Sequence, residues 1–356
     1  MIATAPGKLI LTGEYAVLDG APALVIAVDR RVTARRRTGP RGSSPFLVAV
    51  ADEIASRFGA DHPATRAAME IVVDSRAFFL GTTKLGLGSS AAVTVAATAL
   101  ALSSAHDKVP VIDRDVVQSV AAAAHAAAQS ARPRTPAAEL SRRTRSPSRS
   151  DLTAQLGPES IASGVRGSGA DIASAVHGGV IAFQSAPDPA STVRRLTWPR
   201  GVTLLPFFTG AAADTAELVA SVAAARVANR AAVDAALAAI AKASRAACQA
   251  CESRAPEIAA NALLAALALA GHATDQLAAA TGLPLVPPCV ADARAVLAKC
   301  NGTAKTTGAG GGDVAIAVIP DTEDVARARR LLIEVGCQPL DLAVDTTGVD
   351  LQPDAQ

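Results

Sequence analysis

The sequence predicts an α+β protein with two domains. Short runs of valine, isoleucine and leucine are typical of buried strands, and long alanine-rich segments are typical of helices. At 356 residues the chain is long enough for two hydrophobic cores. We place the division at residues 187–189, which gives an N-terminal domain of residues 1–188 and a C-terminal domain of residues 189–356.

The composition argues against several classes of function. Half of the residues are hydrophobic but only 3% are aromatic, so the core is built from small side chains. A net charge of only +2 argues against a nucleic-acid-binding protein, which normally has a concentrated basic face. Five scattered cysteines favour a reducing compartment, and residues 1–8 lack the pattern of a signal peptide. We therefore expect a cytoplasmic monomer or homodimer with no nucleic-acid or membrane partner.

Strands and helices are expected along the whole chain. The apolar patterns indicate strands at 9–12, 23–28 with a half-exposed continuation over 30–37, 71–74, 177–183, 202–208 and 314–319. Helices are expected at 52–57, 63–69, 113–129, 172–176, 216–254, 256–269, 289–299 and 323–335, followed by a polar tail. Cys248 and Cys251 have no second pair of metal ligands, so we expect them on neighbouring turns of a core helix. His125, on the helix 113–129, is expected to be packed or solvated.

The segment Lys84-Leu-Gly-Leu-Gly-Ser-Ser-Ala-Ala-Val93 is the strongest local signal of a binding site. Gly86 and Gly88 can take positive φ and allow close approach to a ligand, and a buried helix follows to about residue 105. A glycine turn at a helix N-terminus leaves backbone N–H groups free, and these attract phosphate. Lys84 adds a full positive charge. A tight turn that merely caps a core helix is the alternative.

Two other interpretations of this segment lead to different functions. The spacing Gly86-x-Gly88-x-x-Ala91 fits a dinucleotide-binding fingerprint, and Asp107 stands roughly where its acidic residue is expected, so an NAD-dependent oxidoreductase stays open. A Walker-type P-loop is excluded because no Gly-Lys-Ser/Thr closes the glycine run. Residues 85–106 are long enough to cross a membrane, but they are too weakly apolar to insert. We expect a helix buried in a soluble protein.

Two further glycine-rich turns have the composition of binding sites. Gly167-Ser-Gly-Ala-Asp171 presents an aspartate at the start of a helix, although Ser168 or Asp171 could simply cap that helix. Residues 304–313 hold four glycines among five residues, which is unfavourable in chain entropy and indicates a function. Lys8 follows Pro-Gly at the start of the first strand. It is either a solvated surface lysine or a charge that reaches inward.

Residues 131–163 differ sharply from the rest of the chain. They are rich in arginine, serine and proline and hold few large apolar residues. Such a composition cannot bury enough surface to offset the entropy of ordering, so we predict a disordered or loosely attached insert. A nucleic-acid-binding arm is the alternative to a solvated loop, and we favour the loop.

Taken in order, three segments resemble the signature motifs of the GHMP small-molecule kinases. They are Pro6-Gly-Lys-Leu-Ile-Leu-Thr-Gly-Glu-Tyr-Ala-Val-Leu-Asp-Gly20, Gly86-Leu-Gly-Ser-Ser-Ala91 and Thr307-Gly-Ala-Gly-Gly-Gly-Asp313. Within that superfamily the chain most resembles the phosphomevalonate kinases. The indicators are Glu14-Tyr-Ala-Val-Leu18, Lys84-x-Gly-Leu-Gly-Ser-Ser90, the segment 167–176 and Phe208-Thr-Gly-x-x-Ala-x-Thr215. Mevalonate kinases usually have Pro-x-Gly-Ala-Gly at the approach to the serine loop.

The resemblance implies a fold and a set of site residues. It implies a ribosomal-protein-S5-like N-terminal domain, a ferredoxin-like C-terminal domain and a site between them that uses ATP, Mg²⁺ and phosphomevalonate. Lys8 and Asp171 match the family's catalytic lysine and aspartate. ATP phosphates are expected at Lys84, Gly86, Leu87, Gly88, Ser89, Ser90 and Ala91, with Ser90 also a magnesium contact. The acceptor is expected at Lys8, Ser168, Gly169, Lys305, Gly308, Ala309 and Gly310.

Phosphoryl transfer suits these residue types because it needs positioning and charge neutralisation more than covalent help. A phosphate monoester has a second pKa of about 6 and is largely ionised at pH 7, so a strong base is unnecessary. Asp171 would then orient Lys8, the acceptor or magnesium. It would abstract a proton only from an alcohol acceptor.

Two departures from the family pattern keep other functions open. About 33 residues separate the helix that carries His125 from the Gly-Ser-Gly turn, where the family has almost none. We also find no match for the glutamate with which mevalonate kinases help to bind magnesium. The alternatives are a mevalonate kinase or another GHMP kinase, the NAD-dependent oxidoreductase, and a non-catalytic homologue inactivated by the insert.

Overall fold

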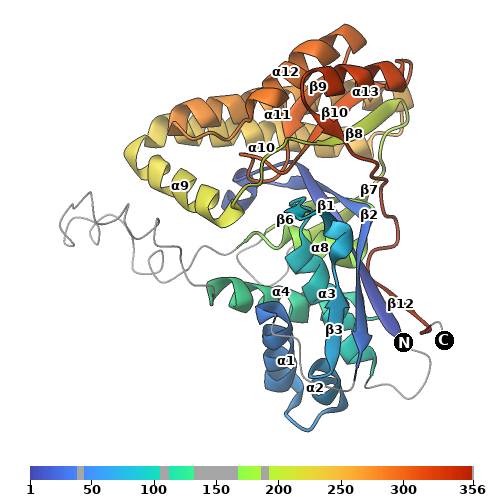
Figure 1. Cartoon of the computed structure of the whole chain (residues 1–356). Helices are drawn as coiled ribbons and strands as arrows, with labels where there is room; N and C mark the ends of the chain where they lie inside the picture. Colours follow the sequence, from blue (N-terminus) through green and yellow to red (C-terminus); the bar gives the residue numbers. More distant parts are fainter. Residues whose placement is uncertain (38–43, 105–111, 132–166, 186–191, 355–356) are drawn as a thin grey trace.

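The computed structural model describes residues 1–37, 44–104, 112–131, 167–185 and 192–354. Nearly all of the predicted insert, the expected domain boundary at 187–189 and Asp107 lie outside these described residues. The α+β prediction is confirmed, because two antiparallel sheets form the centres of the lower and upper halves of the molecule in Figure 1.

The first sheet has the strand order β12-β1-β2-β6-β7, and β3 pairs with the far end of β2. Its strands are β1 Ile2–Thr12, β2 Ala23–Arg36, β3 Ile71–Asp74, β6 Val180–Gln184, β7 Thr192–Leu196 and β12 Asp350–Gln352. Its helices are α1 Pro45–Phe58, α2 Pro63–Ala68, α3 Ser89–Ser103, α4 Arg114–Ser130 and α8 Ala170–His177. The short elements η1 Ala16–Asp19, η2 Arg76–Phe78, β4 Phe79–Leu80 and β5 Thr83–Lys84 complete this half. α3 and α8 pack directly on β1 and β2.

The second sheet has the strand order β11-β8-β10-β9, which is fourth, first, third, second in chain order. This is the order of a ferredoxin-like βαββαβ unit. Its strands are β8 Val202–Phe208, β9 Thr303–Thr306, β10 Val314–Pro320 and β11 Gln338–Pro339. Its helices are α9 Thr215–Ala228, α10 Arg230–Glu252, α11 Pro256–Thr281, α12 Pro288–Leu297 with η3 Ala298–Cys300, and α13 Val325–Glu334.

The side chains of strand β10 show that this sheet is covered by helices on both faces. Successive side chains of a strand point to opposite faces, and every residue of β10 before its terminal proline is buried. Ala315, Ala317 and Ile319 belong to the cluster that includes α12 and α13. Val314, Ile316 and Val318 belong to the core that includes α10 and α11.

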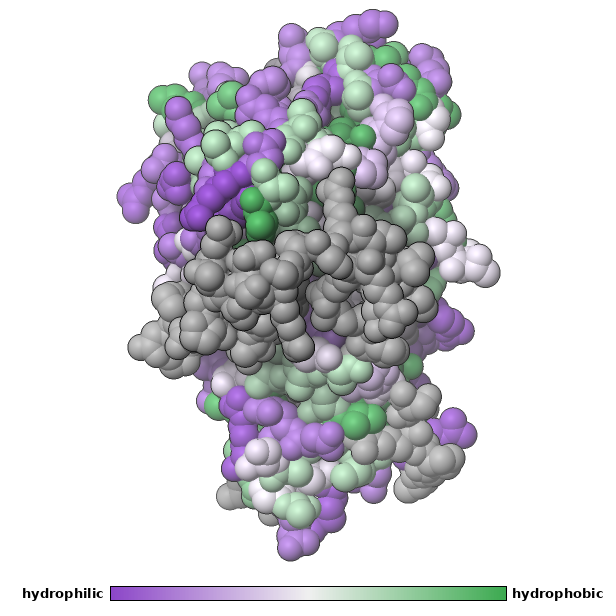
Figure 2. Space-filling view, turned by 90° about the vertical axis from the view of Figure 1, so that its left-hand side faces the viewer, coloured by the Kyte–Doolittle hydropathy of each residue, from purple (hydrophilic) through white to green (hydrophobic). Residues whose placement is uncertain are grey.

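α11 is long and apolar enough to cross a membrane by composition, with a mean hydropathy of 1.3. Half of that segment is buried, and it packs against α10 and β9 as a core helix. The segment from residue 85 forms the shorter α3, whose buried residues confirm the expected core helix. Cys248 and Cys251 lie buried on α10, as predicted. On the side shown in Figure 2, hydrophilic and hydrophobic residues are interspersed above and below the grey atoms.

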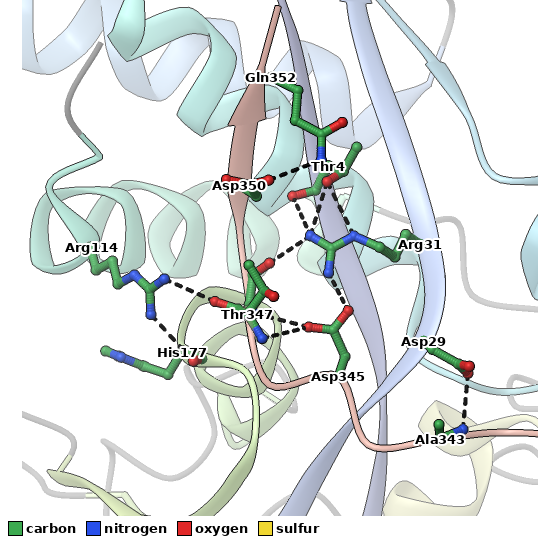
Figure 3. A network of polar contacts seen from close by, with 11 residues as sticks. Thr4, Asp29, Arg31, Arg114, His177, Ala343, Asp345, Thr347, Asp350 and Gln352 are labelled. Carbon is green, nitrogen blue, oxygen red and sulfur yellow. Dashed lines mark hydrogen bonds and ion pairs between the residues drawn. The ribbon is translucent and has the colours of Figure 1, made fainter. Parts of the chain in front are cut away.

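The C-terminal segment corrects the expectation of a polar tail, because β12 returns to the first sheet and pairs with β1. The guanidinium of Arg31 holds this segment in place: it pairs with Asp345 and donates to the carbonyl oxygen of Gly348 at 2.6 Å and to Thr4 Oγ1 at 2.9 Å. Figure 3 shows this network beside Arg114, which donates to the carbonyl oxygen of Thr347 at 2.8 Å. Because β7 also joins β6, the first sheet takes strands from both sides of the expected domain boundary.

Candidate active site

Lys8 lies where the first and second motifs meet. A register shift between Pro6 and Gly7 interrupts the pairing of β1 with β2, and the backbone N–H of Lys8 then donates to the carbonyl oxygen of Leu87 at 2.9 Å. The Lys8 side chain runs across Gly88: a Cβ atom added to that glycine would lie 3.0 Å from Lys8 Cε. The half-buried lysine therefore reaches inward over the glycine turn.

The glycine turn delivers the N-terminus of α3 to the same place. Gly88 is the N-cap at φ 75°, a conformation that favours glycine, and no side chain caps the helix. The first-turn N–H groups are therefore available to an anionic ligand. Leu87 and Ala91 are fully buried, whereas Gly86, Gly88 and Ser90 are half-buried, so the turn is open to a ligand at these three residues.

The third glycine-rich loop is bonded to the first motif. The backbone N–H of Gly308 donates to the carbonyl oxygen of Ile10 at 3.2 Å. The hydroxyl of Tyr15 donates to the carbonyl oxygen of Ala309 at 2.6 Å. Asp313, the last residue of this loop, touches the second motif, because a Cβ atom added to Gly86 would lie 2.3 Å from its Oδ2. Three segments that are far apart in the sequence thus come together.

Asp171 lies in the first turn of α8, after Gly169 at φ 86°. Ser168 Oγ accepts from the backbone N–H of Ala170 at 3.3 Å, so this serine does have the local bond expected of a helix start. Asp171 Oδ1 accepts from the backbone N–H of Ile172 at 3.1 Å, and its half-buried carboxylate keeps its other oxygen for further partners.

The charges of these segments act on one another. Burial lowers the pKa of the Lys8 ammonium below its usual value, the carboxylates of Asp171 and Asp313 oppose this shift, and Lys84 adds to it. Burial raises the pKa of the Asp313 carboxyl, against the effects of the Ala213 N–H and of Lys8. Two carboxylates and one further ammonium thus act on the charge of Lys8.

The predicted role of Lys305 in binding the acceptor needs correction. Its side chain is 1% exposed, and its ammonium forms an ion pair with the equally buried Glu14. It also donates to the carbonyl oxygens of Leu11 at 2.7 Å and Thr306 at 2.5 Å, which uses all three of its N–H donors. Lys305 therefore ties β9 to the first motif and has no donor left for a substrate.

His125 contacts a predicted phosphate-binding residue that sequence reasoning had not linked to it. It is packed as expected, 4% exposed, with its ring 5.2 Å from that of Phe46. Its Nε2 atom lies 3.2 Å from Ser90 Oγ. One turn further along α4, Gln129 reaches Gly167: a Cβ atom there would lie 3.2 Å from Gln129 Oε1. The two described ends on either side of residues 132–166 are therefore neighbours, which suits an insert of low closure cost.

The sheet topology overturns the dinucleotide-binding interpretation. That fingerprint requires a parallel βαβ unit in which the glycine turn joins a strand to the crossover helix. Here the turn follows β5, a strand of two residues in a small antiparallel hairpin with β4. Every strand pairing in the described part of the chain is antiparallel.

Comparison with known proteins relates this chain to the GHMP kinases. Residues 256–336 match the family described as GHMP kinases C terminal. The phosphomevalonate kinase of Streptomyces sp. (strain CL190) is 27% identical over an alignment of 407 positions, gaps included, which covers 97% of each chain. The chain is thus similar to the GHMP kinases in its C-terminal part and to a phosphomevalonate kinase over nearly its whole length.

Solved structures of low sequence identity share the GHMP kinase fold. The Lin0012 protein of Listeria innocua superposes with a TM-score of 0.73 at 21% identity, covering 98% of this chain and 99% of that one. Streptococcus pneumoniae phosphomevalonate kinase, in complex with phosphomevalonate and AMPPNP, superposes with a TM-score of 0.70 at 16% identity over 97% and 99% of the two chains. Mevalonate kinase and galactokinase structures share this GHMP kinase fold too, so the fold alone does not fix the acceptor.

Proposed function

We propose that this protein is a GHMP kinase that transfers the terminal phosphoryl group of ATP to 5-phosphomevalonate and forms 5-diphosphomevalonate. The observation that carries this proposal is the position of Lys8, which lies across Gly88 at the N-terminus of α3 and within the fields of Asp171 and Asp313. The full-length similarity to a phosphomevalonate kinase supports the choice of acceptor.

The nucleotide phosphates would bind at the glycine turn. The backbone N–H groups at the start of α3 have no side-chain cap and can donate to an anion, and the positive end of the helix dipole adds to the attraction. Gly86, Leu87, Gly88, Ser89, Ser90 and Ala91 form this cradle, and the exposed Lys84 supplies a further charge. The hydroxyl of Ser90, at the edge of this cradle, is in hydrogen-bond contact with His125 Nε2.

Magnesium fits the residues present. No group of three or more histidine, cysteine or acidic side chains in the described part of the chain could hold a metal by itself. This suits Mg²⁺, which is usually bound by one or two protein oxygens together with substrate phosphates. Ser90 and Asp171 offer such oxygens, and the bound ion would neutralise phosphate charge.

The acceptor would bind against the other two loops. Ser168 and Gly169 precede α8, while Gly308, Ala309 and Gly310 belong to the loop that is anchored on Ile10 and Tyr15. Lys8 would offset the repulsion between two anionic substrates. Because a phosphate monoester is already ionised at neutral pH, Asp171 would orient the reacting groups and would not need to remove a proton.

A panel of acceptors with ATP and Mg²⁺, followed by coupled release of ADP, tests this function. Phosphomevalonate should be used far faster than mevalonate, galactose or homoserine. Equal or reversed rates for mevalonate would refute the acceptor assignment. If no acceptor in the panel supports release of ADP, either by the full chain or by a variant that lacks residues 131–163, the non-catalytic homologue would be favoured.

A further inference from the structure

Asp313, the last residue of the third glycine-rich loop, is held by hydrogen bonds of both its backbone and its side chain. Its backbone N–H donates to the carbonyl oxygen of Ala211 at 2.7 Å, and its carbonyl oxygen accepts from the backbone N–H of Thr209 at 3.0 Å. Its Oδ1 atom accepts from the backbone N–H of Ala213 at 3.4 Å. With φ at 56°, it is one of three residues other than glycine with positive φ in the described part of the chain.

The other carboxylate oxygen of Asp313 lies against the glycine turn. A Cβ atom added to Gly86 would come within 2.3 Å of Oδ2 and 2.4 Å of Cγ, so only glycine leaves room for this carboxylate. Asp313 therefore touches the backbone of the turn proposed to bind phosphate. It also lies within the field of Lys8, whose side chain crosses the same turn at Gly88.

A carboxylate in this place is electrostatically unfavourable for the binding of two anionic substrates. Like charges at close range repel by several kcal/mol in a partly buried site, unless a cation lies between them. Lys8 is that cation, because the charges of Asp171 from α8, Asp313 from the third loop and Lys84 all act on it. Two carboxylates from separate segments would restrict where the lysine ammonium can lie.

We propose that Asp313 is a positioning residue, whose carboxylate, together with that of Asp171, holds the Lys8 ammonium over the glycine turn without contacting either substrate. This role rests on the proposed phosphoryl transfer. Substitution by asparagine preserves the size of the side chain and tolerates positive φ, and its amide oxygen can still accept from Ala213. Asp313→Asn thus removes the charge alone.

Kinetics and stability of Asp313→Asn separate positioning from a structural role. We expect kcat to fall about 10- to 100-fold, as for a misplaced catalytic group, while the KM for ATP changes less than about threefold. The melting temperature should stay the same or rise, because an acid whose pKa is raised on folding destabilises the folded state when it is ionised. Asp61→Asn, an exposed site between α1 and α2, is the matched control and should match the wild type in both measurements.

A second measurement does not depend on catalysis. Competitive labelling of lysine amines with acetic anhydride across pH, read by mass spectrometry, gives the apparent pKa of Lys8. Loss of the Asp313 charge should lower this value by about one unit relative to the wild type and to Asp61→Asn. An unchanged Lys8 pKa, or wild-type kcat in Asp313→Asn, would overturn the proposal. If the wild type phosphorylates no acceptor, the proposed function fails, and the labelling result still decides whether Asp313 acts on Lys8.

Discussion

Lys8 lies on β1 of the first sheet and Lys305 on β9 of the second, each beside a glycine-rich segment. The two lysines nevertheless have opposite environments. Lys305 is fully buried, and Glu14 and two backbone carbonyl oxygens take all of its donors. Lys8 is half-buried and belongs to none of the ion pairs found among the described residues, although two carboxylates act on it at longer range. The first lysine joins two parts of the fold, and the second keeps its charge for a ligand.

The difference shows that occupied hydrogen-bond donors, more than burial or charge, separate a structural lysine from a catalytic one. A lysine has three N–H donors and no acceptor. Where the protein itself supplies three acceptors, no substrate can be bound without breaking the structure. The predictions below test whether the two lysines separate in this way.

The largest expected effect is on turnover. Lys8→Met should lower kcat by about 10³-fold, because it removes a full charge from the site of phosphoryl transfer. The fold should persist, with a melting temperature within about 4 °C of the wild type, since no ion pair of the described residues is lost. Steady-state kinetics and calorimetry on one preparation check both results, and near-wild-type turnover would remove Lys8 from the mechanism.

Lys305→Met should act mainly on stability. It leaves the Glu14 carboxylate buried without its partner, which typically costs about 3–5 kcal/mol in the free energy of unfolding. Urea denaturation measures this loss. The double variant Lys305→Met with Glu14→Leu should recover much of it, because no uncompensated charge remains. A single variant as stable as the wild type would contradict the structural role.

The pH dependence of kcat/KM should distinguish the neighbours of Lys8. The pKa of Lys8 is lowered by burial, so activity that needs the ammonium should fall on the alkaline side as pH rises through that lowered value. Asp171→Asn removes a charge that raises this pKa, and it should move the alkaline limb to lower pH. Lys84→Met removes a charge that lowers it, so the limb should move to higher pH. Shifts in the same direction would be inconsistent with this arrangement.

The smallest expected effect concerns His125. His125→Leu removes the contact with Ser90 Oγ and should weaken binding of a magnesium–nucleotide complex about threefold to tenfold, the range for one hydrogen bond. His125→Gln can place an amide nitrogen near the position of Nε2, and it should recover part of the loss. Titration calorimetry with a non-hydrolysable ATP analogue compares the two variants. Affinities equal to that of the wild type in both variants would show that the contact is without consequence.

Long apolar strands and the order of the glycine-rich motifs were accessible to sequence reasoning. The residues of β8 and β3 match their predicted ranges, and β10 extends its range by one proline. These strands are strong signals because burial on at least one face demands apolar residues. The resemblance of three ordered motifs to one kinase superfamily predicted the fold, which the structure confirms.

Several short strands were missed, although the half-exposed continuation of β2 was predicted. β7 has the sequence Thr-Val-Arg-Arg-Leu and is largely exposed, and β12 has three residues held by backbone pairing and by the Arg31 network. Backbone pairing leaves little trace in side-chain pattern. The segment 216–254 was predicted as helix without a break, whereas the structure ends α9 and starts α10 at Asn229, with φ at −135°.

Long-range partners were also beyond sequence reasoning. Glu14 and Lys305 are 291 positions apart, so nothing in the local pattern marks Lys305 as a buried ion-pair partner. Asp313 ends the glycine-rich motif, but its contact with Gly86 depends on how the two halves of the chain meet. Such roles emerge from packing, which short motifs do not encode.

The most direct test of the central claim is acceptor-dependent release of ADP by the wild type beside Asp171→Asn, with phosphomevalonate, ATP and Mg²⁺ at pH 7. The convergence of three loops on one transfer site predicts rapid turnover by the wild type and a loss of at least about 100-fold in the variant, with the fold intact. Equal turnover by the two proteins would contradict the claim.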